Sequence, residues 1–312
     1  MILVTGASGF IGQSLVARLK SGGMPVRAAV RGSSKSGHPG AETIEIGNID
    51  GETGWGPSLS GISAIVHCAA KAKAPAGGTR DSLSEFRDIN VHGALNLARQ
   101  AAAAGVRRFV FVSSTRVLGD ATETGRPFTP NDAPNPQDNY GLTKLEAEQG
   151  LREISGAAGM ELVILRPPIV YGPGMKSALG AAARWMLKGA PLPLGAIDSP
   201  RSLIALDNLT DLLAMCAHHP KAAGETLLAC DGEDLSVTGF LQRLSRAAGK
   251  PSRLLPVPPR VIQFCASAVG AKTFGERLCA PLQVDMSQTQ RLLDWSPPLS
   301  VDAALKRLVS RP

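Results

Sequence analysis

Aromatic side chains are scarce in this chain of 312 residues, since they make up 4% of the composition and only two of them, Tyr140 and Tyr171, are tyrosines. The net charge is +7, but lysine and arginine are spread along the chain without forming a basic run. Proteins that bind nucleic acid usually cluster their cations and combine them with aromatic residues. We therefore expect no nucleic-acid partner, and an anionic small substrate and cofactor instead.

Long apolar runs are also missing. The sequence contains no stretch of about 18 uncharged apolar residues, which a membrane-spanning helix would need. The first expected strand begins at Ile2, which leaves no room for a signal peptide before it. With a hydrophobic content of 44%, the chain can bury a sizeable core. We expect a folded cytoplasmic protein without a membrane partner.

Cysteine is too sparse and too irregularly spaced for a disulfide framework or a zinc site. The five cysteines are odd in number and show no C-x-x-C spacing, and each lies among apolar neighbours. His218 and His219 are adjacent, but no further ligands follow at a suitable spacing. The sequence therefore predicts reduced, buried thiols and no metal.

Short apolar segments alternate with helical segments through the first two-thirds of the chain. This alternation predicts an α/β fold, a Rossmann-type doubly wound parallel sheet with right-handed crossovers. Beyond Pro167 the pattern loosens, which predicts a dinucleotide-binding domain over 1–166 and a smaller substrate lobe over 167–312, with segments that return to the first domain. The expected strands cover 2–4, 26–30, 44–46, 64–67, 109–112 and 162–165, and the expected helices cover 13–20, 85–104, 140–154, 177–188, 207–218 and 236–248.

A glycine triplet, Gly6, Gly9 and Gly12, stands between the first strand and the first helix. Backbone without side chains can approach a pyrophosphate there, and the helix N-terminus offers unpaired N–H groups. The triplet therefore predicts a dinucleotide site, with cofactor contacts at Ser8, Phe10 and Ile11. After the strand at 64–67, the small residues Cys68, Ala69 and Ala70 would let the backbone pass close to the cofactor. The alternative is that these small residues serve packing alone.

The end of the second strand bears on the choice of cofactor. An acidic residue there would hold the ribose 2′-hydroxyl of NAD, but this chain has Arg31, with Lys35 close behind. Cations suit a 2′-phosphate, so the sequence favours NADP. The alternative is that both are solvated charges at a loop mouth and that NAD is used.

Tyr140 and Lys144 have the i, i+4 spacing that places two side chains on one face of a helix. An ammonium beside the phenol would lower the pKa of Tyr140 from about 10 towards working pH. This pair predicts a tyrosine that transfers a proton.

In this order the motifs resemble the extended short-chain dehydrogenase/reductases of the NAD-dependent epimerase/dehydratase family, which act on nucleotide sugars. The resemblance spans essentially the whole chain. Its motifs are the glycine loop, Asn90, residues 113–119, Tyr140 with Lys144, Leu165-Arg166-Pro167, residues 170–174, residues 206–209 and Leu293-Asp294-Trp295. The chain departs from the family pattern at Leu118, where a tyrosine is common, and at Arg31.

The resemblance implies roles for individual residues. Ser114, with Thr115 as the fallback, would hydrogen-bond the reacting sugar oxygen, Tyr140 would transfer the proton, and Lys144 would bind the nicotinamide ribose. Further cofactor contacts are expected at Asn48, Ile49, Asn90 and Pro167, and substrate contacts at Lys71, Arg166, Lys176, Arg201 and Arg277. For Arg166 a structural ion pair at a strand end is the alternative.

Within the family, residues 166–174, 191–195 and 201–203 resemble enzymes of bacterial surface-polysaccharide synthesis. Arg31 favours a reductase that uses NADPH to reduce C4 of a UDP-4-keto-6-deoxy-N-acetylhexosamine. The alternative is a UDP-sugar 4-epimerase with tightly bound NAD. A regulatory NADP sensor on the same fold would not need Ser114, Tyr140 and Lys144. The resemblance also implies a homodimer.

Overall fold

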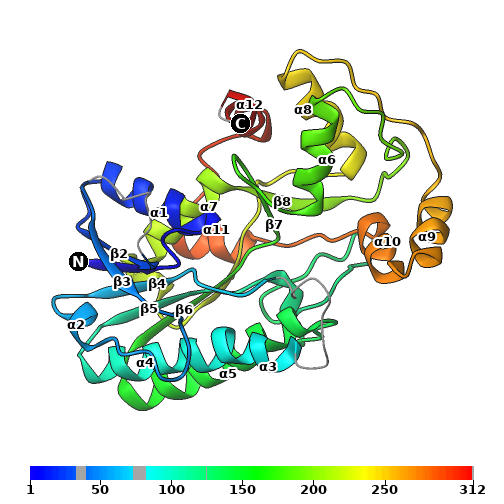
Figure 1. Cartoon of the computed structure of the whole chain (residues 1–312). Helices are drawn as coiled ribbons and strands as arrows, with labels where there is room; N and C mark the ends of the chain where they lie inside the picture. The colour runs from blue at the N-terminus through cyan, green and yellow to red at the C-terminus, as the bar shows by residue number, and fades with distance from the viewer. Residues whose placement is uncertain (33–39, 73–81, 124, 311–312) are drawn as a thin grey trace.

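The computed structural model describes residues 1–32, 40–72, 82–123 and 125–310 (Figure 1). Its centre is a seven-stranded parallel sheet in the order β3-β2-β1-β4-β5-β6-β9. The inner strands are buried along their whole length, which is why they read as continuous apolar runs. The strands are β1 (Ile2–Thr5), β2 (Val26–Arg31), β3 (Glu42–Ile46), β4 (Ala64–His67), β5 (Arg108–Val112), β6 (Glu161–Arg166) and β9 (Thr226–Leu228).

Helices cover both faces of this sheet, as a doubly wound fold requires (Figure 1). One face packs against α1 (Phe10–Ser21), α7 (Leu206–Cys216) and α11 (Ser287–Leu293). The other packs against α2 (Gly56–Leu59), α4 (Ala94–Ala103) and α5 (Asn139–Ala158), next to which lies α3 (Ser82–Arg87). The predicted fold class is confirmed.

The helix predicted over residues 85–104 is interrupted. A π-helical segment (Asp88–Gly93) separates α3 from α4 and carries the buried Asn90. Gly93 lets this segment approach the chain after β3, because a Cβ there would lie 2.8 Å from the side chain of Ile49. Hydrophobic spacing alone does not distinguish such a bulge from a regular helix, although π-bulges are frequent at functional sites.

A second, smaller core lies beyond β6. Its three-stranded sheet has the order β10-β8-β7, formed by β7 (Ile169–Tyr171), β8 (Arg201–Ala205) and β10 (Asp234–Leu235). The helices α6 (Ala178–Leu187), α8 (Val237–Ala247) and α12 (Val301–Ser310) pack in the same cluster. Since β9 joins the large sheet, the chain crosses back after this lobe has begun. The domain boundary at residue 166 stays a prediction.

Between α8 and α12 the chain forms a helical hairpin of α9 (Pro259–Ala268) and α10 (Lys272–Cys279). Cys265 on α9 is exposed, so the expectation that every thiol is buried is wrong at this position. The reason is that α9 buries none of its residues, so apolar neighbours in the sequence do not imply a packed environment there. Within the described ranges, no helix combines the length and apolarity needed to cross a bilayer.

Candidate active site

The glycine loop follows β1 directly and is shaped by close backbone contacts. Gly6 has a φ of +64°, and a Cβ on it would lie 2.8 Å from the backbone of Ala69. A Cβ on Gly12 would lie 2.2 Å from the carbonyl oxygen of Gly6. The N-terminus of α1 begins after Gly9 without a side-chain cap. This bare, uncapped backbone fits a dinucleotide pyrophosphate, and Ser8, Phe10 and Ile11 are the adjoining residues that would hold it.

The other predicted cofactor residues lie where strands of the large sheet end, at the edge that carries the glycine loop. Arg31 ends β2 and is exposed, whereas Lys35 lies outside the described residues. Asn48 and Ile49 follow β3, and Ile49 packs against the core. Cys68, Ala69 and Ala70 follow β4, and Pro167 follows β6. Ligands of open parallel sheets bind at this edge, so the arrangement is compatible with one shared site.

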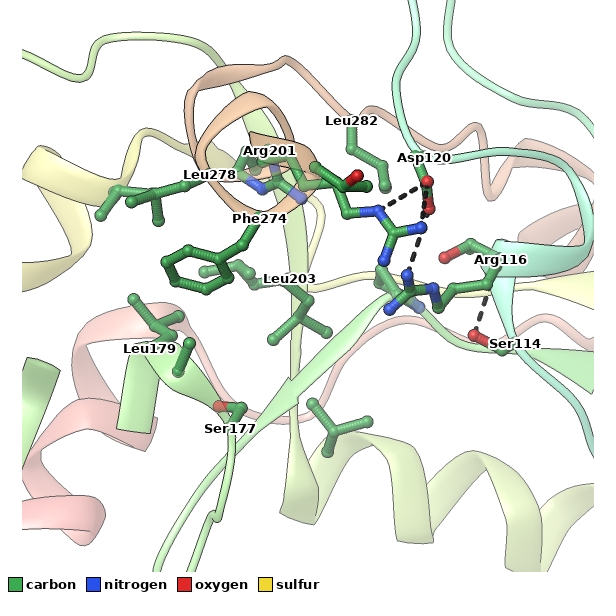
Figure 2. Close-up of a pocket in the computed structure, with 18 of the residues that line it drawn as sticks. Ser114, Arg116, Asp120, Ser177, Leu179, Arg201, Leu203, Phe274, Leu278 and Leu282 are labelled. Carbon is green, nitrogen blue, oxygen red and sulfur yellow. Dashed lines mark hydrogen bonds and ion pairs between the residues drawn. The ribbon is translucent and has the colours of Figure 1, made fainter. Parts of the chain in front are cut away.

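Ser114 and Tyr140 line one cavity of about 760 Å³, together with Thr115. Ser114 follows β5, is 9% exposed, and accepts a hydrogen bond of 3.2 Å from the backbone N–H of Arg116 (Figure 2). Tyr140 lies in the first turn of α5, where Asp138 caps the helix by accepting a bond of 2.8 Å from the backbone N–H of Gly141. A capped helix end holds the phenol in a fixed place beside the cavity.

Lys144 lies one turn further along α5, with 1% of its surface exposed. Its ammonium lies 3.7 Å from the centre of the Phe111 ring, a cation–π contact. Burial lowers the pKa of Lys144 to about 7, although the neighbouring carboxylate of Glu148 opposes the shift. This amine therefore exchanges its proton near neutral pH.

The phenol does not have the lowered pKa that the sequence led us to expect. Burial raises the pKa of Tyr140 to about 12, while the guanidinium of Arg116 opposes the shift and the carboxylate of Asp138 adds to it. The expectation of a lowered value is wrong for this structure, because the loss of hydration outweighs the nearby positive charge.

Arg166 forms a structural ion pair, which was the alternative to a substrate contact. Its Nε donates 3.0 Å to Oε1 and a terminal nitrogen donates 2.6 Å to Oε2 of Glu148, and both side chains are buried. Glu148 also accepts a hydrogen bond from Ser113, the neighbour of Ser114. Arg166 is not among the residues that line the cavity. Sequence reasoning missed Glu148, although its position four residues after Lys144 was a usable signal.

Arg201 and Arg277 do line the cavity. Figure 2 labels Arg201. One terminal nitrogen of Arg201 donates to the carbonyls of Arg277 at 2.6 Å and Ala280 at 2.5 Å, which ties β8 to the end of α10. Burial lowers the pKa of Arg201. Guanidinium groups in such a cavity suit phosphate oxygens.

Arg277 belongs to a cluster of four alternating charges that the sequence did not reveal. Its terminal nitrogens lie 2.6 Å from Asp120 and 3.3 Å from Asp138. Arg116 lies 3.3 Å from Asp120 and 2.5 Å from Asp138 (Figure 2 shows Arg116 and Asp120). We call these four residues the charge cluster. It joins α10 of the lobe to the N-terminus of the helix that carries Tyr140.

The remaining predicted residues lie around the cavity rather than in its wall. Lys71 pairs with Glu85, and its backbone exchanges two hydrogen bonds with the side chain of Asn90, of 2.8 and 3.0 Å. Asn90 also donates 3.1 Å to Thr143 on α5. Asn90 thus ties the loop after β4 to α5. Lys176 is exposed beside Ser177, which lines the cavity.

A glycine loop at the carboxyl edge of a parallel sheet, next to a cavity with a serine and a helix-borne tyrosine, defines a protein of the short-chain dehydrogenase/reductase class. The model of the NAD dependent epimerase/dehydratase family matches residues 2–230, and the chain belongs to this family. The predictions of an enzyme and of this family are confirmed.

One relative is 39% identical over 308 residues, which cover 98% of this chain and 93% of the relative, and it is a UDP-glucose 4-epimerase of Vibrio cholerae. Two solved structures from Bacillus cereus share the fold. The UDP-N-acetylglucosamine 4-epimerase has a TM-score of 0.80 at 23% identity, covering 99% of this chain and 98% of that one. The UDP-glucuronic acid 4-epimerase in complex with NAD has a TM-score of 0.79 at 21% sequence identity, and the match covers 99% of this chain and 95% of that one.

Proposed function

We propose that this protein is a 4-epimerase of a UDP-linked hexose with tightly bound NAD. The relative from Vibrio cholerae, similar over nearly the whole of both chains, supports the epimerase. The observation that carries the proposal is that Ser114 and Tyr140 face the same cavity, at the sheet edge where the glycine loop lies. We prefer the epimerase to the reductase that the sequence favoured on account of Arg31, because of the likeness to this relative.

NAD, when bound, supplies the reversible oxidation at C4 that inversion requires. The bare backbone of Gly6, Gly9 and Gly12 would hold its pyrophosphate, and Lys144 its nicotinamide ribose. The preference for NADP that the sequence predicted from Arg31 stays a prediction. The identity of the dinucleotide that purified protein releases on denaturation checks this point.

Proton transfer falls to Tyr140, with Ser114 donating or accepting a hydrogen bond at the C4 oxygen. A phenol with a pKa of about 12 keeps its proton at neutral pH, so Tyr140 needs a partner to act as a base. Lys144 lies one turn away, and a pKa of about 7 allows its amine to lose or gain a proton at working pH. We infer that Lys144 activates the phenol in this way.

Arg201 and Arg277 would hold the diphosphate, because both line the cavity and guanidinium groups match phosphate oxygens. Thr115 would contact the sugar beside Ser114. Lys71 and Lys176 lie next to cavity residues, and their substrate contacts stay predictions. A homodimer also stays a prediction, which sedimentation velocity would check.

The test uses the two tyrosines of the chain as a matched pair. Tyr140→Phe should lower kcat for the interconversion of UDP-glucose and UDP-galactose by roughly 10²–10⁴-fold, because one acid–base group is removed. Tyr171→Phe, buried in β7 outside the cavity wall, should change kcat little. Full activity of Tyr140→Phe would refute the mechanism. Reduction of a UDP-4-keto sugar without epimerisation would refute the epimerase.

A further inference from the structure

The α9–α10 hairpin forms a projecting edge of the molecule. Figure 1 places α9 outermost, with α10 between it and the rest of the fold. The two helices pack tightly on each other, because a Cβ on Gly275 would lie 2.7 Å from the Cβ of Ala266. The turn between them contains Gly270, with a φ of +74°. Since no residue of α9 is buried, the outer face of this hairpin has no partner among the described residues.

Large apolar side chains concentrate on this hairpin and on the segment that leads into it. Among the described residues, seven large hydrophobic side chains are exposed, and five of them fall within residues 255–274. Val269 is 79% exposed, Phe264 is 75% exposed and Phe274 is 50% exposed. Single exposed apolar residues are ordinary, but a group of this kind in one element marks an interaction surface.

The same segment is strongly basic. Outside the charge cluster, residues 250–276 contain four basic residues and one acidic residue, Glu276, so they carry +3 of the net charge of +7. Glu276 lies 3.9 Å from Lys272, which partly neutralises it. Arg253 and Arg260 are exposed beside the apolar side chains. A helical element that combines exposed phenylalanine and valine with surrounding cations has the composition of surfaces that bind at an anionic membrane interface.

We propose that the α9–α10 hairpin docks on an anionic phospholipid bilayer. Phe264 and Val269 enter the region between headgroups and acyl chains, and the surrounding cations face lipid phosphates. Charge decides against a second copy of this chain as the occupant, because a symmetric dimer through this face would bring two segments of +3 together. This docking goes beyond the proposed epimerase activity and does not depend on it.

Docking would also orient the active site. Phe274 is half exposed on the hairpin and lines the cavity, as do Arg277 and Leu278 further along α10. Figure 2 shows Phe274 and Leu278 on the side of the cavity away from Ser114. The charge cluster holds α10 to the core through Asp120 and Asp138. A bilayer under the hairpin therefore lies next to the lobe side of the cavity, so the enzyme works at a membrane surface.

The experiment is co-sedimentation of the full chain with vesicles of phosphatidylcholine alone or mixed with phosphatidylglycerol. The protein should bind the mixed vesicles, and binding should weaken as salt is raised. The double substitution Phe264→Ser with Val269→Ser should lower the partition coefficient at least about tenfold, because two exposed apolar side chains no longer enter the interface. Arg260→Glu should weaken binding to the mixed vesicles more than to neutral ones.

Trp185→Ser is the matched control, since Trp185 is 63% exposed but lies on α6. It should bind vesicles as the natural chain does. The docking proposal is overturned if the natural chain does not bind mixed vesicles at low salt, or if the double variant binds them equally well. It is also overturned if sedimentation velocity shows a dimer that the double variant loses. Epimerase activity on a soluble UDP-sugar, measured in the same preparations, reports separately on the proposed function.

Discussion

Replacing Lys144 with methionine tests whether the amine of Lys144 is buried and has a lowered pKa. The amine is 1% exposed, and burial lowers its pKa from the ordinary 10.5 to about 7. In the unfolded chain the lysine keeps its proton up to the ordinary value. Between these two pKa values the unfolded state therefore binds more protons, and the natural protein becomes more stable as pH rises. Methionine, of similar length, has no such dependence.

The expected change in the free energy of unfolding follows from the difference between the folded and unfolded pKa values of Lys144. A lowering of this extent corresponds to a cost of about 5 kcal/mol when the pH is below the folded pKa of Lys144. Part of this cost is removed as the amine loses its proton. Between pH 7 and pH 9 the free energy of unfolding of the natural protein should therefore rise by about 2 kcal/mol relative to that of the Lys144→Met variant. At pH 7 the variant should be the more stable of the two, although it is inactive.

The assay is urea unfolding of both proteins at the two pH values, after removal of bound dinucleotide, with the free energy of unfolding taken from linear extrapolation. Lys306→Met removes a positive charge from the exposed face of α12 and serves as the control. If the difference between Lys144→Met and the natural protein were the same at both pH values, the amine would be hydrated. The argument that it activates Tyr140 would then fail.

Two further predictions concern Arg166 and Arg31. Arg166→Met leaves the buried carboxylate of Glu148 without its ion-pair partner, so the free energy of unfolding should fall by about 3–5 kcal/mol in chemical denaturation. Arg243→Met, which breaks the more exposed pair with Glu233, should lower it by about 1 kcal/mol or less. Equal losses in the two variants would contradict the argument from burial. Arg31→Asp should shift the ratio of dissociation constants towards NADH over NADPH, measured by fluorescence titration, and an unchanged ratio would remove Arg31 from cofactor choice.

The parallel sheet was predictable because its inner strands are buried on both faces and so appear as unbroken apolar runs. The predicted strands at 64–67 and 109–112 coincide with β4 and with all but the first residue of β5. The short strands β7, β8, β9 and β10 were missed. Their pairing depends on partners far along the chain, as when Asp234 and Leu235 pair with Ser202 and Arg201, and such short segments carry little periodicity of their own.

In the candidate site, too, local features were predictable and contacts between distant segments were not. Local motifs were enough to single out Ser114 and Tyr140, which line one cavity, while the catalytic roles of these residues and of Lys144 stay predictions. The role of Arg166 depended on Glu148, which comes from α5, eighteen residues earlier in the chain. The pairing of Asp120 with Arg277 spans 157 residues, so no local pattern reveals it. The pKa of Tyr140 depended on hydration, which the sequence does not contain.

The charge cluster has a consequence for selectivity. Two guanidinium groups and two carboxylates cancel in net charge, so an anion that approaches Arg277 must compete with carboxylates already in contact with it. A free hexose brings no charge and gains nothing there, and a monoanion gains little. A diphosphate should compete best with Asp120 and Asp138, because its two adjoining phosphoryl groups can offer anionic oxygens to both arginines at once. If the enzyme acts on a UDP-linked hexose as proposed, the charge cluster therefore selects for the diphosphate, and free hexoses should be poor substrates.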